Sequence, residues 1–104
     1  MQYVITAEHP PQLCPTGNAQ IREMVQTGMP QLPALAEKNG LQIITANIFG
    51  PDHVILFVVE AGSIESVRSF TLDARLYQWN TVKINATFTP EEALQSLDGV
   101  DPIF

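Results

Sequence analysis

Two runs of strand-forming residues, Leu41–Phe49 and His53–Val59, are separated only by Gly50-Pro51-Asp52. Both runs are rich in β-branched and aromatic residues, and a breaker of this length joins adjacent strands that run in opposite directions. The stretch therefore predicts an antiparallel β-hairpin in the middle of the chain. Any fold assigned to the chain has to contain this hairpin, and the flanking segments decide which fold that is.

The residues before the hairpin predict a strand and a helix. Alternating side chains predict a strand over residues 2–8, which ends where Pro10 and Pro11 remove backbone donors. Apolar residues at helical spacing follow, interrupted at TGMPQLP, and the element closes at residues 38–40. We expect a kinked helix or two short helices that begin at Pro15, with Cys14 near the N-cap.

The residues after the hairpin predict a helix, a strand and a short terminal helix. Ser63 is the expected N-cap of a helix that runs to about Leu76. WNTVKINATF predicts the last strand, and Thr89 begins a capping box for the terminal helix. The order β-α-β-β-α-β fits an α+β fold of the ferredoxin-like kind, in which two helices cover one face of a four-stranded antiparallel sheet. With no linker or repeat, we expect one domain over residues 1–104.

Strand alternation divides the sheet residues between two faces. The face under the helices is expected to hold Ile5, Ala7, Ile44, Ala46, Ile48, Val82, Ile84, Ala86 and Phe88. The open face is expected to hold Val4, Thr6, Glu8, Ile43, Thr45, Asn47, Phe49, Thr81, Lys83 and Asn85. Because the open face is half apolar and half polar, we expect it to be shared between a second copy and a small ligand cavity.

Composition excludes several classes of partner. The formal net charge is -6 and the five Lys and Arg residues are scattered, so the chain has no basic patch for nucleic acid or an anionic membrane. The longest apolar run, residues 54–59, is too short to cross a bilayer. A single cysteine and the immediate start of a strand predict a cytoplasmic location. Charged residues make up only 15%, which predicts a homodimer whose second copy covers part of the surface.

The loop HPPQLCP carries the clearest candidate chemistry. It places His9 five residues before Cys14, the only cysteine. At a helix start Cys14 would be stabilised as a thiolate by the positive end of the helix dipole, and His9 could act as a base. The pair therefore indicates nucleophilic or redox chemistry. The alternative is a buried, inert cysteine beside a histidine that ends a strand.

A metal site is a second interpretation of the same loop. It would draw on Glu8, His9, Cys14 and His53, because imidazole, thiolate and carboxylate donors together suit nickel, zinc or copper. No closely spaced pair such as His-x-x-x-His supports it, so the leading hypothesis assigns no metal ligand. Whether His53 approaches the loop depends on the strand register.

The open face offers candidate contacts for a small organic ligand. The candidate ligand-binding residues are Thr6, Glu8, Asn47, Lys83, Asn85 and Trp79. Lys83 and Glu8 form a potential charge pair, and Trp79, at the entrance of the last strand, could stack on an aromatic ligand. The alternatives are hydrogen bonds across a dimer contact for the polar set and packing for Trp79.

The element order, the acidic strand end VVEAGS and the tail motif TPEEA resemble the ferredoxin-like dimeric α/β-barrel superfamily, in particular its small uncharacterised bacterial families. The resemblance implies a homodimer that pairs sheet against sheet. Members include cofactor-independent monooxygenases, isomerases, haem-degrading enzymes and a nickel-binding protein. The Asn-Trp-Arg triad of the haem-degrading members is not recognisable here, and no histidine lies on the last strand or the preceding helix.

The leading hypothesis is a homodimer that binds a small organic molecule. It would act without a cofactor, as an isomerase or oxygenase type of enzyme, with His9 as base and Cys14 as nucleophile. The alternatives are a metal-binding protein and a purely structural or regulatory dimer. Whether the protein is an enzyme is left open by its sequence.

Overall fold

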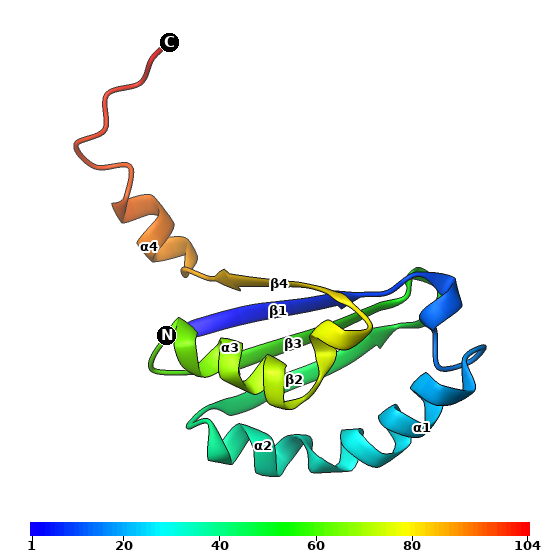
Figure 1. The fold of residues 1–104 in the computed structure, drawn as a ribbon. Coiled ribbons are helices and arrows are strands. Elements are labelled where there is room, and N and C mark those ends of the chain that lie inside the picture. Colours follow the sequence, from blue (N-terminus) through cyan, green and yellow to red (C-terminus); the bar gives the residue numbers. More distant parts are fainter.

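The computed structural model describes residues 1–104 and contains one antiparallel sheet. Its strands are β1 (Gln2–Glu8), β2 (Gln42–Phe49), β3 (Val54–Glu60) and β4 (Thr81–Ala86), in the spatial order β2-β3-β1-β4 (Figure 1). This is the predicted α+β arrangement, and it is consistent with a ferredoxin-like fold. The central hairpin is confirmed as β2 and β3, which pair in antiparallel register.

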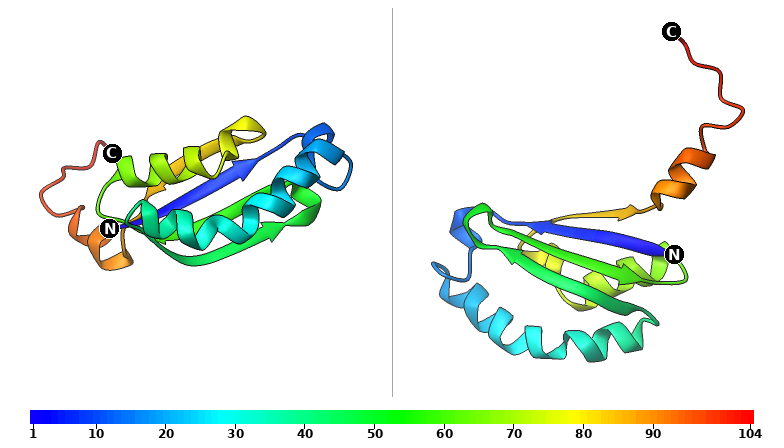
Figure 2. Two further views of the ribbon diagram at one scale, coloured as in Figure 1. Left: turned by 60° about the horizontal axis from the view of Figure 1, so that its bottom comes forward. Right: turned by 180° about the vertical axis from the view of Figure 1, so that it is seen from behind.

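The helices lie on one face of the sheet, as predicted (Figure 2). They are α1 (Ala19–Gly28), α2 (Leu32–Lys38) and α3 (Ile64–Asp73), and the short α4 (Pro90–Gln95) follows β4. The predicted interruption of the first helical segment is a single 3₁₀ turn, Met29–Gln31, between α1 and α2. No helix is long and apolar enough to qualify as a membrane span.

The core lies between the two central strands and the helices. Every second residue of these strands is buried there, namely Tyr3, Ile5 and Ala7 of β1 and Ile55, Phe57 and Val59 of β3. From α3, Val67 and Phe70 are fully buried against them, and the Phe70 ring meets the Phe57 ring edge-on with centroids 6.2 Å apart. A one-residue slip of β1 against β3 would move this whole apolar set to the open face, so burial holds the register.

A β-bulge in β2 makes the predicted faces of two residues wrong. Ile43 pairs with Val59, whereas Thr45 pairs with the adjacent Val58, so one residue is inserted between them. Ile43, expected on the open face, packs against the core, and Ile44, expected under the helices, is 50% exposed. Simple alternation contains no signal for an inserted residue. Beyond the bulge, Ala46 and Ile48 pair with Phe57 and Ile55 and so keep their predicted face, although Ile48 is 64% exposed.

Three predicted boundaries are also wrong. The helix α3 ends at Asp73 rather than near Leu76, because Arg75 adopts a left-handed conformation with φ 60°. A 3₁₀ turn, Leu76–Gln78, follows, so the last strand starts at Thr81 and not at the tryptophan. Phe88, expected under the helices, lies beyond the end of β4 and is 71% exposed.

The last residues form an exposed segment, here called the C-terminal arm (Phe88–Phe104). The predicted capping box is confirmed: the Thr89 hydroxyl accepts the Glu92 N–H at 3.1 Å, and the Glu92 carboxylate accepts the Thr89 N–H at 3.3 Å. The arm projects from the end of β4 (Figures 1 and 2). It raises the radius of gyration to 16.4 Å, against about 13 Å for a compact chain of this length.

Replacing Phe70 tests the core. We expect Phe70→Ala to lower the free energy of unfolding by about 3–5 kcal/mol, because it removes a fully buried ring and leaves a cavity. Leu72→Ala, on the exposed side of the same helix, should change it by less than about 0.5 kcal/mol. Urea unfolding followed by far-UV circular dichroism measures both, and equal losses would contradict the assigned core.

Candidate metal centre

The β1–β3 pairing brings the two histidines of the chain side by side. The last paired residues are Glu8 and Val54, and the ladder is extended by a hydrogen bond from the His9 N–H to the His53 carbonyl, 3.1 Å long. The two imidazole rings meet edge-to-face with centroids 5.3 Å apart. The sequence left open whether the strand register brings His53 to the loop that carries His9. The observed register does so.

The backbone of His53 is unusual. The residue closes the hairpin after the 3₁₀ turn Gly50–Asp52 and adopts a left-handed conformation, with φ 56° and ψ 41°. This region is unfavourable for most residues with a side chain. Its ring atom Nδ1 is buried and has no hydrogen-bond partner. Histidine, like asparagine and aspartate, is found in this region more often than most residues with a side chain, so the unpaired buried nitrogen, and not the backbone, indicates a role for the ring.

Asn80 determines which nitrogen of His9 carries the proton. The Asn80 amide Nδ2 donates to the Leu76 carbonyl at 3.1 Å, so its Oδ1 is the acceptor for His9 Nδ1, 3.0 Å away. In the neutral ring the proton therefore sits on Nδ1, and the lone pair sits on Nε2. His9 is 7% exposed and its Nε2 has no partner. A histidine held through its other nitrogen is the usual arrangement of a metal ligand.

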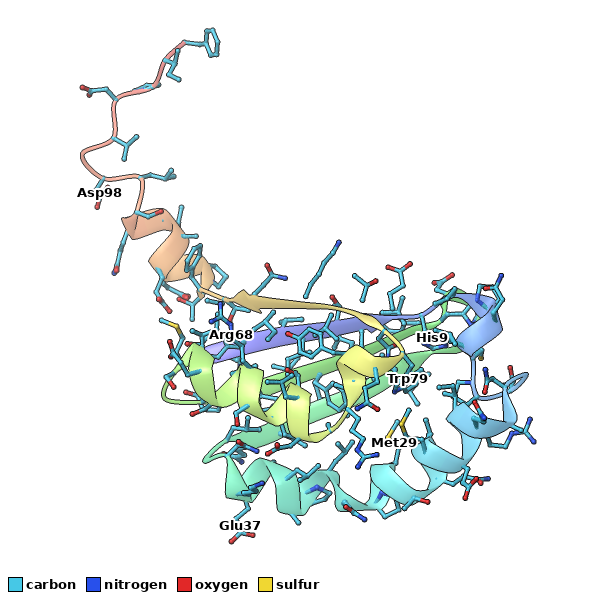
Figure 3. All side chains as sticks on the ribbon, viewed as in Figure 1. His9, Met29, Glu37, Arg68, Trp79 and Asp98 are labelled. Atoms are coloured by element: carbon cyan, nitrogen blue, oxygen red, sulfur yellow. The ribbon has the colours of Figure 1, made fainter.

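Trp79 packs against His9 instead of facing the open sheet surface. The two rings are 4.9 Å apart between centroids and tilted by 42° (Figure 3). Trp79 is buried in the core cluster, in the turn before β4. The proposed contact with an aromatic ligand on the open face therefore has no geometric support, and the packing alternative describes its position.

Cys14 does not lie at the N-cap of a helix, as the sequence had predicted. It ends a 3₁₀ turn, Pro11–Leu13, while the N-cap of α1 is Asn18, whose side chain accepts the Ile21 N–H at 3.0 Å. The helix-dipole reason for a thiolate is therefore wrong. A different cause acts in the same direction: the Thr16 hydroxyl, 3.0 Å from Sγ, and then the Thr16 backbone N–H lower the pKa of Cys14, while burial opposes them.

The three side chains converge on one point. The ligand atoms of His9, Cys14 and His53 all lie within 4.8 Å of one another. Glu8, which the metal hypothesis also included, is exposed and is not part of the group. None of the five principal hollows of the molecule is lined by any of the three residues. The site therefore offers donors to an ion, and no principal hollow for an organic substrate opens at them.

The polar candidates of the open face lie on one face of the sheet, as expected, but they line none of the principal hollows. Strand pairing puts Lys83 beside Thr6 and Asn85 beside Val4, with Asn47 on the same face. Lys83 forms no ion pair with Glu8; the ion pairs of the chain are Met1–Glu60 and Lys38–Asp73. The five principal hollows are not lined by these residues.

No protein-family model matches the chain, and no curated protein is significantly similar to it. The assignment to a ferredoxin-like fold therefore rests on the sheet order and the element order. The function has to be inferred from the geometry of the site.

The hydrogen bond from Thr16 can be tested through the thiol. We expect Thr16→Val to raise the pKa of Cys14 towards the ordinary cysteine value of about 8.5, because the hydroxyl donor is lost. Below that pH the variant should hold less thiolate than the wild type, and well above it the two should be equal. Thiolate absorbance against pH, with Cys14→Ser as the blank, measures the pKa. Thr27→Val, an exposed threonine of α1, is the control and should leave it unchanged.

Proposed function

We propose that the protein binds one transition-metal ion through His9, Cys14 and His53. Two observations carry the proposal. One ring nitrogen of each histidine and the Cys14 sulfur lie within 4.8 Å of one another. Each histidine also has a buried ring nitrogen without a partner, Nε2 in His9 and Nδ1 in His53. Buried polar atoms are nearly always hydrogen-bonded, and an unpaired one costs free energy. A metal ion would satisfy both nitrogens and the sulfur at once.

The surroundings of the donors support the same proposal. Asn80 orients the His9 ring and leaves its Nε2 lone pair available, and Thr16 favours the thiolate of Cys14. The β1–β3 ladder and the hairpin position His53. Imidazole and thiolate donors select zinc, copper or nickel rather than magnesium or calcium. The function supported best is therefore that of a transition-metal-binding protein.

Metal titration of the untagged protein tests this function. We expect one equivalent of Zn²⁺ or Cu(I) per chain, with binding that protects Cys14 from alkylation and changes the fluorescence of Trp79, which packs on His9. His53→Asn should weaken binding at least about 10-fold, because the imidazole is lost while asparagine tolerates the left-handed backbone. His9→Gln and Cys14→Ser should have the same effect.

Glu8→Gln is the control for this titration. It removes an exposed carboxylate that is adjacent to His9 in the chain and is not part of the donor group, so the affinity should not change. Absence of stoichiometric binding by the folded wild type, or binding that survives all three ligand substitutions, would refute the proposed function.

The thiol–imidazole pair also fits nucleophilic catalysis. In that interpretation the Nε2 of His9 accepts the Cys14 proton and Asn80 holds the ring, as in cysteine nucleophiles activated by an oriented histidine. Reaction with an organic substrate needs space next to the sulfur, and no principal hollow reaches it. The metal function is therefore preferred. Acceleration of a reaction by metal-free protein, lost in both Cys14→Ser and His9→Gln, would favour catalysis instead.

We also propose that two copies of the protein pair through their open sheet faces. Two apolar surfaces support it. The open face presents the half-buried aliphatic residues Val4, Leu56 and Val58. The C-terminal arm exposes Phe88, Leu94, Leu97, Val100, Ile103 and Phe104, each by at least 63%. Apolar side chains left exposed in such numbers are typical of an interface.

A charge on the open face tests the pairing. Light scattering coupled to size exclusion should give the mass of a dimer for the wild type, and Leu56→Lys should yield the monomer, because it places an ammonium in the contact. Leu72→Lys, at an exposed leucine of α3 on the helical face, should remain dimeric. A wild-type monomer at all concentrations would contradict the pairing and would leave the metal site unaffected.

A further inference from the structure

The donor set of the site points to a particular ion. Resting on the metal site proposed above, we infer that the site is selective for monovalent copper, Cu(I), over Zn²⁺. Three properties of the site carry this inference: the number of donors, their summed charge and the softness of the sulfur.

The number of donors is too small for an ordinary structural zinc site. His9, Cys14 and His53 are the only His, Cys, Asp or Glu side chains in the group. Structural zinc is almost always bound by four protein ligands in a tetrahedron, and catalytic zinc keeps a water or substrate as the fourth. The carboxylates next in the chain, Glu8 and Asp52, are exposed and lie outside the group. Cu(I), with a filled d shell, forms stable three-coordinate complexes with thiolate and imidazole donors.

The summed charge of the donors favours a monovalent ion. One thiolate and two neutral imidazoles carry a single negative charge, which Cu(I) neutralises, whereas Zn²⁺ leaves one uncompensated positive charge. His9 is only 7% exposed and Cys14 only 9%, and the ring of Trp79 packs on His9. A net charge without a counter-ion is costly in such a buried place. The neutral Cu(I) complex avoids that cost.

The sulfur adds to the selectivity because sulfur is a softer donor than nitrogen or oxygen. The Thr16 hydroxyl lies 3.0 Å from Sγ and is oriented by the short loop that the two residues share. A soft thiolate forms its strongest bonds with soft ions, among which Cu(I) ranks above Zn²⁺.

Displacement of zinc by copper tests the inference. Untagged protein loaded with one equivalent of Zn²⁺ is mixed, without oxygen and with a reductant, with one equivalent of Cu(I) held by a weaker chelator. We expect quantitative release of Zn²⁺, read with a chromogenic zinc chelator, and separate competition titrations should give a Kd for Cu(I) at least about 100-fold below that for Zn²⁺. Cys14→Ser should reduce this ratio at least about 10-fold, because it replaces the soft donor with a hard one.

The variant Asp52→Asn tests whether Asp52 acts as a fourth ligand. If only three residues bind the ion, this variant should leave both affinities unchanged. Retention of Zn²⁺ against Cu(I), or zinc binding that weakens 10-fold or more in Asp52→Asn, would overturn the copper inference in favour of a four-ligand zinc site, and the metal function would stand. If the folded protein binds neither ion, both the inference and the proposed function fail.

Discussion

The pairing of β1 with β3 is the constraint on which the rest of the structure depends. It places the buried residues of both central strands on the helical face, where Phe57 meets Phe70 of α3. The same ladder continues for one further hydrogen bond, from the His9 N–H to the His53 carbonyl. Because the apolar core cannot tolerate a register shift, the position of the two histidines is set by hydrophobic burial as much as by their own contacts.

The site is assembled from three short irregular segments at one end of this rigid ladder. His9 leaves the strand, Cys14 ends a 3₁₀ turn, and His53 closes the hairpin. A fourth segment, the turn before β4, supplies Asn80 and Trp79. Residues on loops gain fixed geometry only where a scaffold and a second layer of contacts hold them. Here Asn80 provides that layer for His9, and Thr16 provides it for Cys14.

The pKa of the Cys14 thiol is lowered by a different cause from the one that the sequence suggested. The proline after Cys14 suggested a helix start, but α1 begins four residues later, capped by Asn18. The pKa of Cys14 is nevertheless lowered, because the hydroxyl and the backbone N–H of Thr16 form hydrogen bonds with the sulfur. Pro15 and Asn18 are both plausible helix-start signals, and the local sequence does not rank them. In the folded chain, the Asn18 side-chain oxygen accepts the Ile21 N–H, and this hydrogen bond makes Asn18 the N-cap.

Local periodicity and turn chemistry are enough to predict the order of elements, the hairpin, the capping box at Thr89 and the α+β fold. The same local reading marks His9 and Cys14 as candidates. The folded chain adds that His53 joins them, that Asn80 holds His9, and that Trp79 lies in the core rather than on the open face. The β-bulge at Ile44 is also seen only in the folded sheet. Each of these depends on the pairing of distant segments, and pairing is set by the balance of burial over the whole sheet, which no local pattern contains.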